Sequence, residues 1–392
     1  MREIKPLTSL RAFAAFLVFM FHYAHVYRPE NVGVPFGSEW IPLMPVWRQG
    51  PLGVSVFFVL SGFLITRIYF DTMVGRQVSL RLFFVKRIAR IWPLFLVFAL
   101  VQHGVMLIRG QWQPQLDWLV TLSMSQGFFF DLRYAGLPTA WSLTVEESFY
   151  ALTPLLFLTV AWLARGRARA DAPRGWQRNL VLGVAVTAMT VAVVTVGEAL
   201  VKLVLARGWD WGGFMGSRFH MRHATIFGRM PEFALGMVAA FIHRDAPLAR
   251  WLRGWRAPTL VVFCFLAMGA CMWTKDSVMT DGKAVQALTS VALSYSVAAL
   301  TGLLILGLTV EGSRLHRLLS LDLLVYLGKI SYGFYLIQLT VLLEPCVWLS
   351  YKLGPLRVPG LMIMANLICA GFYELVEVPT RRFIVARWGG RR

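Results

Sequence analysis

The sequence predicts an all-α membrane protein of about ten transmembrane helices, folded as one domain over residues 1–392. Hydrophobic residues make up 57% of the chain and charged residues only 15%, which is more apolar surface than one soluble core can bury. Several apolar runs reach the roughly 20 residues that cross about 30 Å of hydrocarbon, among them 179–201, 286–309 and 358–376. So many runs indicate a helical bundle in the bilayer rather than a single anchor.

The predicted crossings follow one another with short connections. In chain order they are 7–27, 50–66, 88–108, 141–164, 179–201, 223–243, 258–274, 286–309, 323–343 and 358–376. The first begins after charged residues, as a signal peptide does, but it contains Arg11 and no small-residue cleavage site follows Tyr27, so we expect it to remain as a helix. The apolar piece 118–130 is too short to cross, and we expect an outer re-entrant or interfacial segment there.

Basic residues in the loops predict the orientation of the bundle. One set of alternate loops holds 24 Lys and Arg residues and the other 12, so the positive-inside tendency places the richer set, and both termini with it, in the cytoplasm. The net charge of +19 comes from 39 Lys and Arg residues against 20 Asp and Glu, and the loop bias explains where most of the basic residues lie. Because the basic residues lie in short loops rather than along an aromatic-studded groove, we expect the lipid bilayer as a partner and no nucleic acid.

The sequence contains no motif that is typical of a metal-binding or nucleotide-binding site. The four cysteines lie in or beside apolar spans without CxxC or Cys/His spacing: Cys264, Cys271, Cys346 and Cys369. No HExxH, P-loop or GxGxxG in strand context occurs. We therefore expect no metal and no bound cofactor.

Two serines in apolar segments, Ser61 and Ser142, are candidate nucleophiles. No GxSxG elbow surrounds either of them, and Ser61 followed by Gly62 is equally typical of close helix packing. A base acting directly on an acceptor hydroxyl is therefore the favoured chemistry.

The first helix carries two ionisable residues on one face. Arg11 and His22 are eleven residues apart, which returns to within about 20° of the same face and separates them by about 16 Å along the axis. With the N-terminus inside, Arg11 lies near the cytoplasmic surface and His22 deeper, toward the outer half, whereas His25 reads as interfacial. A cation near the cytoplasmic surface and a titratable base deeper in the bilayer suit a long anionic donor molecule. The alternative is a snorkelling arginine and a packing histidine.

Basic residues near the cytoplasmic ends of two other spans form candidate anion sites. Arg87 and Arg90 are three residues apart, so they are neighbours on one helical face and can grip phosphates through bidentate hydrogen bonds. Positive-inside anchoring alone also predicts arginines at this position. Lys329, about two turns into its span, lines an anionic cavity or snorkels.

Carboxylates open the fourth predicted span. Glu146 and Glu147 enter an apolar segment just after Trp141, where an unpartnered carboxylate is expensive. The predicted topology puts this helix start in the depth zone of His22, so we expect Glu146, rather than its neighbour, to contact His22 and orient the imidazole as the acid of a triad does.

The remaining polar groups within the spans are expected to be structural. Arg229 and Glu232 are three residues apart and are expected to pair with each other. Ser331, Glu374 and Glu377 lie in or near the last two spans.

Together these segments resemble, in order, the acyltransferase family 3 group of bacterial membrane O-acyltransferases, from Leu10 to about Phe383. The matching stretches are LRAFAAFLVFMFH, GVSVFFVLSGFLIT, FFVKRIARIWPLF, WSLTVEESFY, RMPEFALGM, LGKISYGFYLI and VEVPTRRF. The resemblance implies transfer of an acyl group, usually acetyl, from cytoplasmic acyl-CoA as co-substrate to a hydroxyl, commonly on a glycan, at the bacterial inner membrane. It leaves no room for the extra soluble hydrolase-like domain of some members.

The resemblance also implies roles for residues of this chain. The Arg and His of the family's first helix match Arg11 and His22, and its arginine pair matches Arg87 and Arg90. Its WSL-Glu motif falls on Trp141, Ser142, Leu143 and Glu146. Where the family often has His after the YL of the ninth-span motif, this chain has Gln338.

The predicted site then has three parts. His22, Glu146 and Arg11 are the expected catalytic residues, with His22 as general base. The expected acyl-CoA site is completed by four residues: Arg87, Arg90, Lys329 and Ser61. The expected supporting residues are Trp141, Ser142, Tyr150, Arg229 and Glu232.

The acceptor is the least defined part of the prediction. We expect a saccharide, as exopolysaccharide, lipopolysaccharide or lipid-linked sugar, with a macrolide-like secondary metabolite as the alternative. A transporter or flippase is the rival from another class, since buried Arg, His and Glu residues also build substrate and proton paths. No internal repeat between the two halves supports it.

Overall fold

The computed structural model describes residues 3–26, 33–36, 39–75, 77–111, 115–165, 175–244, 250–280 and 283–389. Tyr27 and most of the Arg-rich loop 165–178, on which parts of the topology prediction rest, lie outside the described residues.

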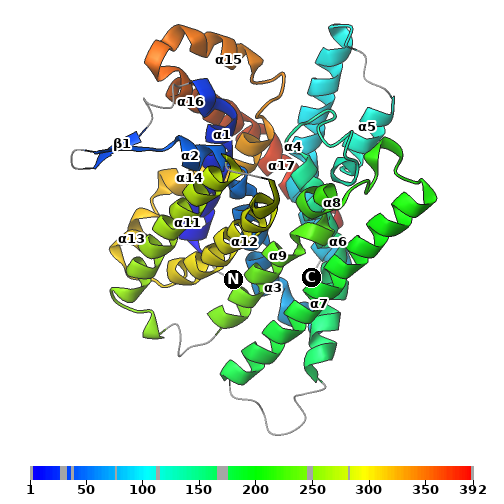
Figure 1. The fold of residues 1–392 in the computed structure, drawn as a ribbon, viewed down its shortest axis with the longest axis vertical. Coiled ribbons are helices and arrows are strands. Elements are labelled where there is room, and N and C mark those ends of the chain that lie inside the picture. Colours follow the sequence, from blue (N-terminus) through cyan, green and yellow to red (C-terminus); the bar gives the residue numbers. More distant parts are fainter. Residues whose placement is uncertain are drawn as a thin grey trace.

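Long helices run alongside one another and make up most of the molecule (Figure 1). They are α1 (Lys5–Tyr23), α3 (Leu52–Val74), α4 (Leu80–Ile108), α6 (Trp141–Arg165), α7 (Gly175–Arg207), α9 (Ile226–His243), α11 (Arg256–Thr280), α12 (Lys283–Leu308), α14 (Asp322–Leu336) and α16 (Arg357–Phe372). Nine helical stretches among the described residues are long and apolar enough to cross a membrane. The predicted class, an all-α multi-pass membrane protein, is thereby confirmed.

Short elements connect the long helices. The helical ones are η1 (Ala24–Val26), α2 (Met44–Arg48), α5 (Gln115–Leu122), η3 (Gln126–Phe128), η4 (Trp211–Gly213), α8 (Arg218–Ala224), α13 (Arg314–Leu318), α15 (Glu344–Ser350), η5 (Tyr351–Leu356), the π-helix η6 (Tyr373–Glu377) and α17 (Val378–Trp388). A two-stranded antiparallel hairpin, β1 (Gly33–Phe36) and β2 (Glu39–Pro42), projects at one edge with Gly33 opposite Pro42 (Figure 1). Long apolar runs in the sequence do not predict this hairpin.

The predicted and observed helix ends differ in two informative places. The predicted spans 50–66 and 88–108 are the apolar parts of α3 and α4, which continue for about two more turns through basic residues. The predicted span 323–343 forms only the 15 residues of α14, because Leu339, with φ of 61°, leaves the helical conformation. The piece 118–130 overlaps the end of α5 and contains η3, and the eight residues of α5 are too short to cross, as predicted.

Glycines bring the central helices into close contact. A Cβ built on Gly236 of α9 would overlap the carbonyl oxygen of Val59 on α3, and one on Gly328 of α14 would overlap that of Thr8 on α1. Side chains from α1, α3, α4, α6, α9 and α14 meet in one large apolar cluster that includes buried phenylalanines such as Phe19, Phe95 and Phe149. This cluster packs α1, α3, α4, α6 and α14 together around the cavity of the candidate site.

Replacing Gly236 by alanine is expected to destabilise the protein. The new methyl group meets backbone rather than a flexible side chain, so α3 and α9 must separate, and overpacking of this kind typically costs about 1–3 kcal/mol. The readout is the thermal midpoint of the detergent-solubilised protein. Gly183→Ala in α7 is the matched control, since open space surrounds that position, and an equal midpoint for both variants would contradict the tight crossing.

Candidate active site

A narrow cavity opens between α1, α3, α4, α6 and α14. Its volume is about 100 Å³, and it adjoins a second cavity of about 510 Å³ through four residues that line both: Arg11, Leu64, Ile68 and Arg90. The larger cavity lies at the start of α1 and is also lined by Lys329, Arg67 and Arg381. The two cavities therefore form one route from the beginning of α1 into the bundle.

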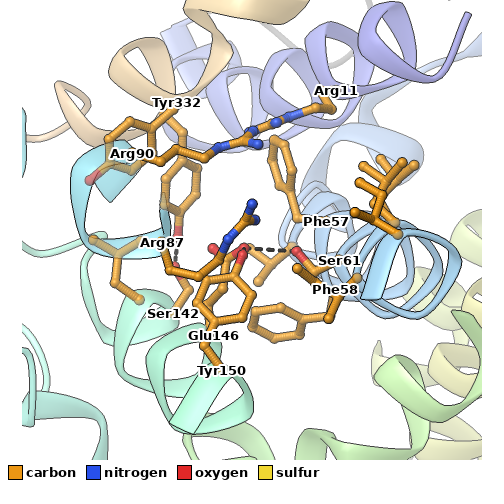
Figure 2. A pocket seen from close by; sticks show the side chains of 17 residues that line it. Arg11, Phe57, Phe58, Ser61, Arg87, Arg90, Ser142, Glu146, Tyr150 and Tyr332 are labelled. Atoms are coloured by element: carbon orange, nitrogen blue, oxygen red, sulfur yellow. Dashed lines mark hydrogen bonds between the residues drawn. The ribbon is translucent and has the colours of Figure 1, made fainter. Parts of the chain in front are cut away.

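Three arginines line the narrow cavity (Figure 2). Figure 2 shows Arg11 and Arg90 along one edge of it, Glu146 and Ser61 on the opposite side, and the Arg87 guanidinium reaching into the space between them. The Arg11 guanidinium lies 5.9 Å from the centre of the Phe57 ring. Among the described residues none of the three arginines has a carboxylate within 4.0 Å.

Some N–H groups of these arginines have no hydrogen-bond partner in the described part of the chain. The Nε atoms of Arg11 and Arg87 are buried without a hydrogen-bond partner. Arg87 stacks between aromatic rings, 5.7 Å from that of Tyr69 and 5.5 Å from that of Tyr150. The three arginines are half-buried and none forms an ion pair within 4.0 Å among the described residues, so the cavity is electrostatically suited to an anion with several charges.

Glu146 faces the arginines from α6. Its Oε1 accepts hydrogen bonds from the Ser61 hydroxyl, at 2.7 Å, and from the Tyr150 hydroxyl. Glu147 points elsewhere, with a buried Oε1 that has no hydrogen-bond partner, so Glu146 is the residue of the pair that lines the cavity.

The predicted contact between Glu146 and His22 is wrong. Tyr150, one turn after Glu146, lies over Arg87, about two turns from the start of α4, so Glu146 is level with the arginines. His22 instead lies in the last turn of α1, where its Nδ1 is 2.8 Å from Oε1 of Gln338. The two helices are offset along their axes by more than the sequence indicates.

Gln338 orients the His22 ring. The Gln338 Nε2 donates to the carbonyl of Phe334 at 3.0 Å, which directs Oε1 toward the histidine. Since Oε1 can only accept, Nδ1 of His22 carries the proton and Nε2 keeps its lone pair. The backbone N–H of Leu339 donates to the Tyr23 hydroxyl at 3.2 Å, so the break after Gln338 is held against α1. Gln338, rather than Glu146, is therefore the residue that contacts the His22 ring.

Two hydroxyl groups lie at the end of the narrow cavity that is nearer to this histidine. Ser142 and Tyr335 both line the cavity, and their hydroxyl oxygens are 2.7 Å apart. Tyr335 also donates to the carbonyl of Thr139 at 2.8 Å. Tyr335 and Gln338 are three residues apart and therefore neighbours on one face of the chain at the end of α14. The narrow cavity thus ends about one turn from the residue that holds His22.

The other predicted residues fall into two places. Lys329 is exposed and lines the larger cavity. Arg229 and Glu232 pair with each other at 2.8 Å, as predicted, and line neither cavity. The Arg229 guanidinium lies 5.9 Å from the centre of the Trp141 ring.

Several lining residues were missed by the sequence reasoning. Tyr332 and Tyr335 line the narrow cavity and Arg381 the larger one. Their spacing offers a signal, because Lys329, Tyr332 and Tyr335 recur every three residues within an apolar stretch, as a polar stripe on one helical face does. The π-helix Tyr373–Glu377 adds two further lining residues to the larger cavity, and such distortions are frequent at functional sites.

The sequence matches the model of the acyltransferase domain family over residues 5–374. The chain belongs to this family. Acyltransferase MdmB of Streptomyces mycarofaciens is 28% identical over 411 aligned residues, which cover 98% of this chain and 93% of that protein. The resemblance and the enzyme class, an acyltransferase, are thereby confirmed.

Two further relatives of this acyltransferase are longer proteins. One from Bacillus subtilis, named as the peptidoglycan O-acetyltransferase YrhL, is 30% identical over 189 residues, or 44% of this chain and 26% of that protein. One from Staphylococcus aureus, named as an O-acetyltransferase, is 22% identical over 97% of this chain and 58% of its own length. No solved structure matches the acyltransferase.

Proposed function

We propose that this acyltransferase moves an acyl group, most simply acetyl, from cytoplasmic acyl-CoA to a hydroxyl of a saccharide at the bacterial inner membrane. The observation that carries the proposal is the set of three arginines, Arg11, Arg87 and Arg90, that line one cavity without a carboxylate partner among the described residues. CoA is a thioester carrier with several phosphate charges, and the planar arginine fork matches phosphate oxygens in two-point hydrogen bonds.

The two cavities suit the two ends of this donor. The larger one has the size for the nucleotide, and its five cations (Arg11, Arg67, Arg90, Lys329 and Arg381) outnumber its two carboxylates, Glu3 and Glu377. Because Arg381 lies 3.9 Å from Glu377, the phosphates are assigned to the other four cations. The narrow one is lined by Phe57, Phe58 and other apolar side chains and suits the thin pantetheine arm. The arm would then pass Glu146 and Ser61 and bring the thioester toward His22, about 16 Å from Arg11 along α1.

His22 is the proposed general base. Its Nε2 removes the proton from the acceptor hydroxyl as the oxygen attacks the thioester carbonyl. The C–S bond then breaks, an ester forms, and the CoA thiolate leaves and takes up a proton. Gln338 keeps the imidazole in the required tautomer. In this scheme Glu146 positions Ser61 and Tyr150 beside the arm and balances part of the arginine charge.

The proposal is tested with the full-length protein reconstituted in liposomes. With acetyl-CoA and a saccharide acceptor present, release of free CoA thiol is expected to depend on the acceptor, and mass spectrometry should find the acceptor heavier by one acetyl group. A macrolide supplied in place of the saccharide tests the alternative acceptor. Movement of the saccharide across the liposome membrane without thiol release would instead identify a transporter.

A further inference from the structure

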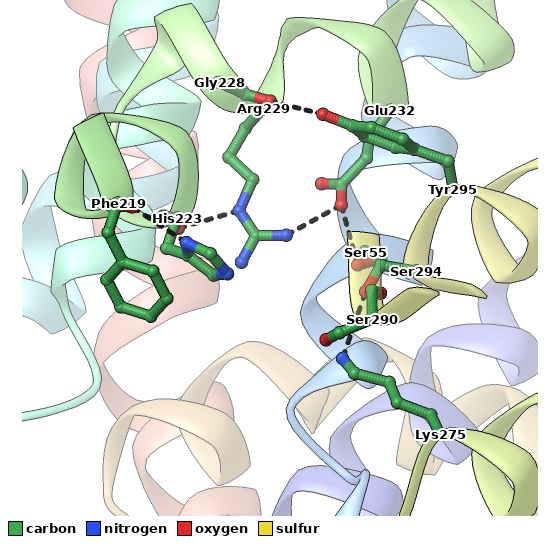
Figure 3. Close-up of polar contacts among 10 residues, drawn as sticks. All are labelled: Ser55, Phe219, His223, Gly228, Arg229, Glu232, Lys275, Ser290, Ser294 and Tyr295. Atoms are coloured by element: carbon green, nitrogen blue, oxygen red, sulfur yellow. Dashed lines mark hydrogen bonds and ion pairs between the residues drawn. The ribbon is translucent and has the colours of Figure 1, made fainter. Parts of the chain in front are cut away.

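A second polar cluster lies inside the bundle beside α9 (Figure 3). None of its residues lines either cavity. Figure 3 shows its side chains converging from α3, α8, α9, α11 and α12. We call it the α9 cluster, and its members are Ser55, His223, Arg229, Glu232, Lys275, Ser294 and Tyr295. The scheme proposed above uses none of these residues.

Glu232 is completely buried but only half satisfied. Its Oε1 accepts from Arg229 and from the Ser55 hydroxyl, each at 2.8 Å. Its Oε2 is buried and has no hydrogen-bond partner, although the side chain is 0% exposed. A buried acceptor without a donor is expensive, so this oxygen is suited to a hydroxyl supplied by a ligand.

The cluster carries more positive than negative charge. Arg229 uses Nε on the carbonyl of His223, at 2.7 Å, and Nη1 on Glu232, while no hydrogen bond of its Nη2 is seen within the described part of the chain. Lys275, half-buried on α11, donates to the hydroxyl of Ser294 at 3.0 Å and has no carboxylate within 4.0 Å among the described residues. Two cations thus face one carboxylate at membrane depth, where surplus charge is costly.

The cluster lies at the same end of the bundle as His22. Arg229 approaches Trp141, and the next residue, Ser142, contacts Tyr335, one turn before Gln338. The arginines Arg87 and Arg90 instead lie within the first three turns of α4, which runs parallel to α14. The α9 cluster is therefore on the proposed acceptor side, away from the donor phosphates.

We propose that the α9 cluster binds an anionic group of the acceptor, a sugar carboxylate or a sugar phosphate, with Lys275 and Arg229 as cations and Glu232 Oε2 accepting from a neighbouring sugar hydroxyl. This inference rests on the proposed function, because it assigns the acceptor class to the same transfer site. It restricts the acceptor to acidic saccharides, such as those that contain uronic acids or are linked through phosphate.

Binding is measured on the detergent-solubilised full-length protein by ligand-dependent thermal stabilisation, with saturating CoA present to fill the arginine cavity. The probes are glucuronate, glucose 1-phosphate and neutral glucose. Wild type is expected to bind at least one anionic probe at least tenfold more tightly than glucose, and the preferred probe distinguishes carboxylate from phosphate. Lys275→Met is expected to weaken that binding at least tenfold, and Lys275→Arg to restore most of it.

Lys202→Met, which removes an exposed lysine from α7, is the matched control and is expected to bind as wild type does. Equal binding of all three probes by wild type, or anion binding that Lys275→Met leaves unchanged, would overturn the inference. Thiol release from acetyl-CoA is followed on the same preparations. Thiol release without selective anion binding would refute only the inference that the acceptor is acidic. Anion binding without thiol release, whichever acceptor is supplied, would refute the proposed acyl transfer.

Discussion

Replacing His22 by alanine is expected to lower acyl transfer about 10²- to 10⁴-fold, the range in which a positioned general base contributes. The variant loses Nε2, the only lone pair that the Gln338 contact leaves available on the ring. Binding of acetyl-CoA should persist, because His22 is not among the residues that line the arginine cavity. The measurement is acceptor-dependent thiol release together with the affinity for acetyl-CoA.

Two further variants separate a base from a packing residue. Gln338→Leu keeps the imidazole but removes the acceptor that holds its tautomer, so we expect an intermediate loss in kcat with the KM for acetyl-CoA unchanged. His25→Ala, three residues along the chain at an exposed position, is the matched control and should transfer at the normal rate. A His22→Ala enzyme that retained near-normal transfer would refute the mechanism.

The sequence predicts the fold class of this protein well because a segment that crosses a bilayer must be composed mainly of apolar residues. Hydrocarbon excludes unpaired backbone polar groups, so long apolar runs such as 179–201 must become helices, and α7 contains that whole run. Helix ends are less predictable. α3 and α4 continue through Arg67 and Arg81 because basic side chains extend along a helix into the headgroup region while their backbone stays helical.

Pairing between helices is the part that the sequence does not determine. Arg11 and His22 share a face because one helix fixes their spacing, and Arg229 meets Glu232 for the same reason. The contact between Glu146 and His22 required two helices to have a particular axial offset, which depends on distant close approaches such as that of Gly328 and Thr8. Local periodicity carries no information about such offsets.

Lys275 is a second residue whose contacts the sequence does not predict. It lies near the end of a predicted span, where a loop lysine is ordinary, and only the packing of α11 against α12 brings it to Ser294, near Glu232 in space (Figure 3). Gln338 departs from the family pattern in the sequence, but its contact with His22 depends on the packing of α1 against α14.

Replacing Arg87 by methionine is expected to raise the KM for acetyl-CoA roughly 10- to 100-fold. Methionine retains much of the apolar stem but removes the charge, and a hydrogen bond to a charged group contributes about 1.5–3 kcal/mol, where each 1.4 kcal/mol corresponds to a factor of ten. The folded protein should tolerate the change, since Arg87 has no carboxylate within 4.0 Å among the described residues and a buried, unsatisfied Nε.

The control for this prediction lies on the same helix. Arg81→Met removes an exposed arginine of α4 that lines neither cavity, so it lowers the net charge of the protein by the same amount without touching the donor route. Repeating the measurement with 3′-dephospho-acetyl-CoA identifies the phosphate involved, because the penalty of Arg87→Met disappears if that residue binds the 3′-phosphate and persists if it binds the diphosphate. Equal KM values for Arg87→Met and Arg81→Met would mean that the arginines serve general attraction to the membrane surface and that the donor binds elsewhere.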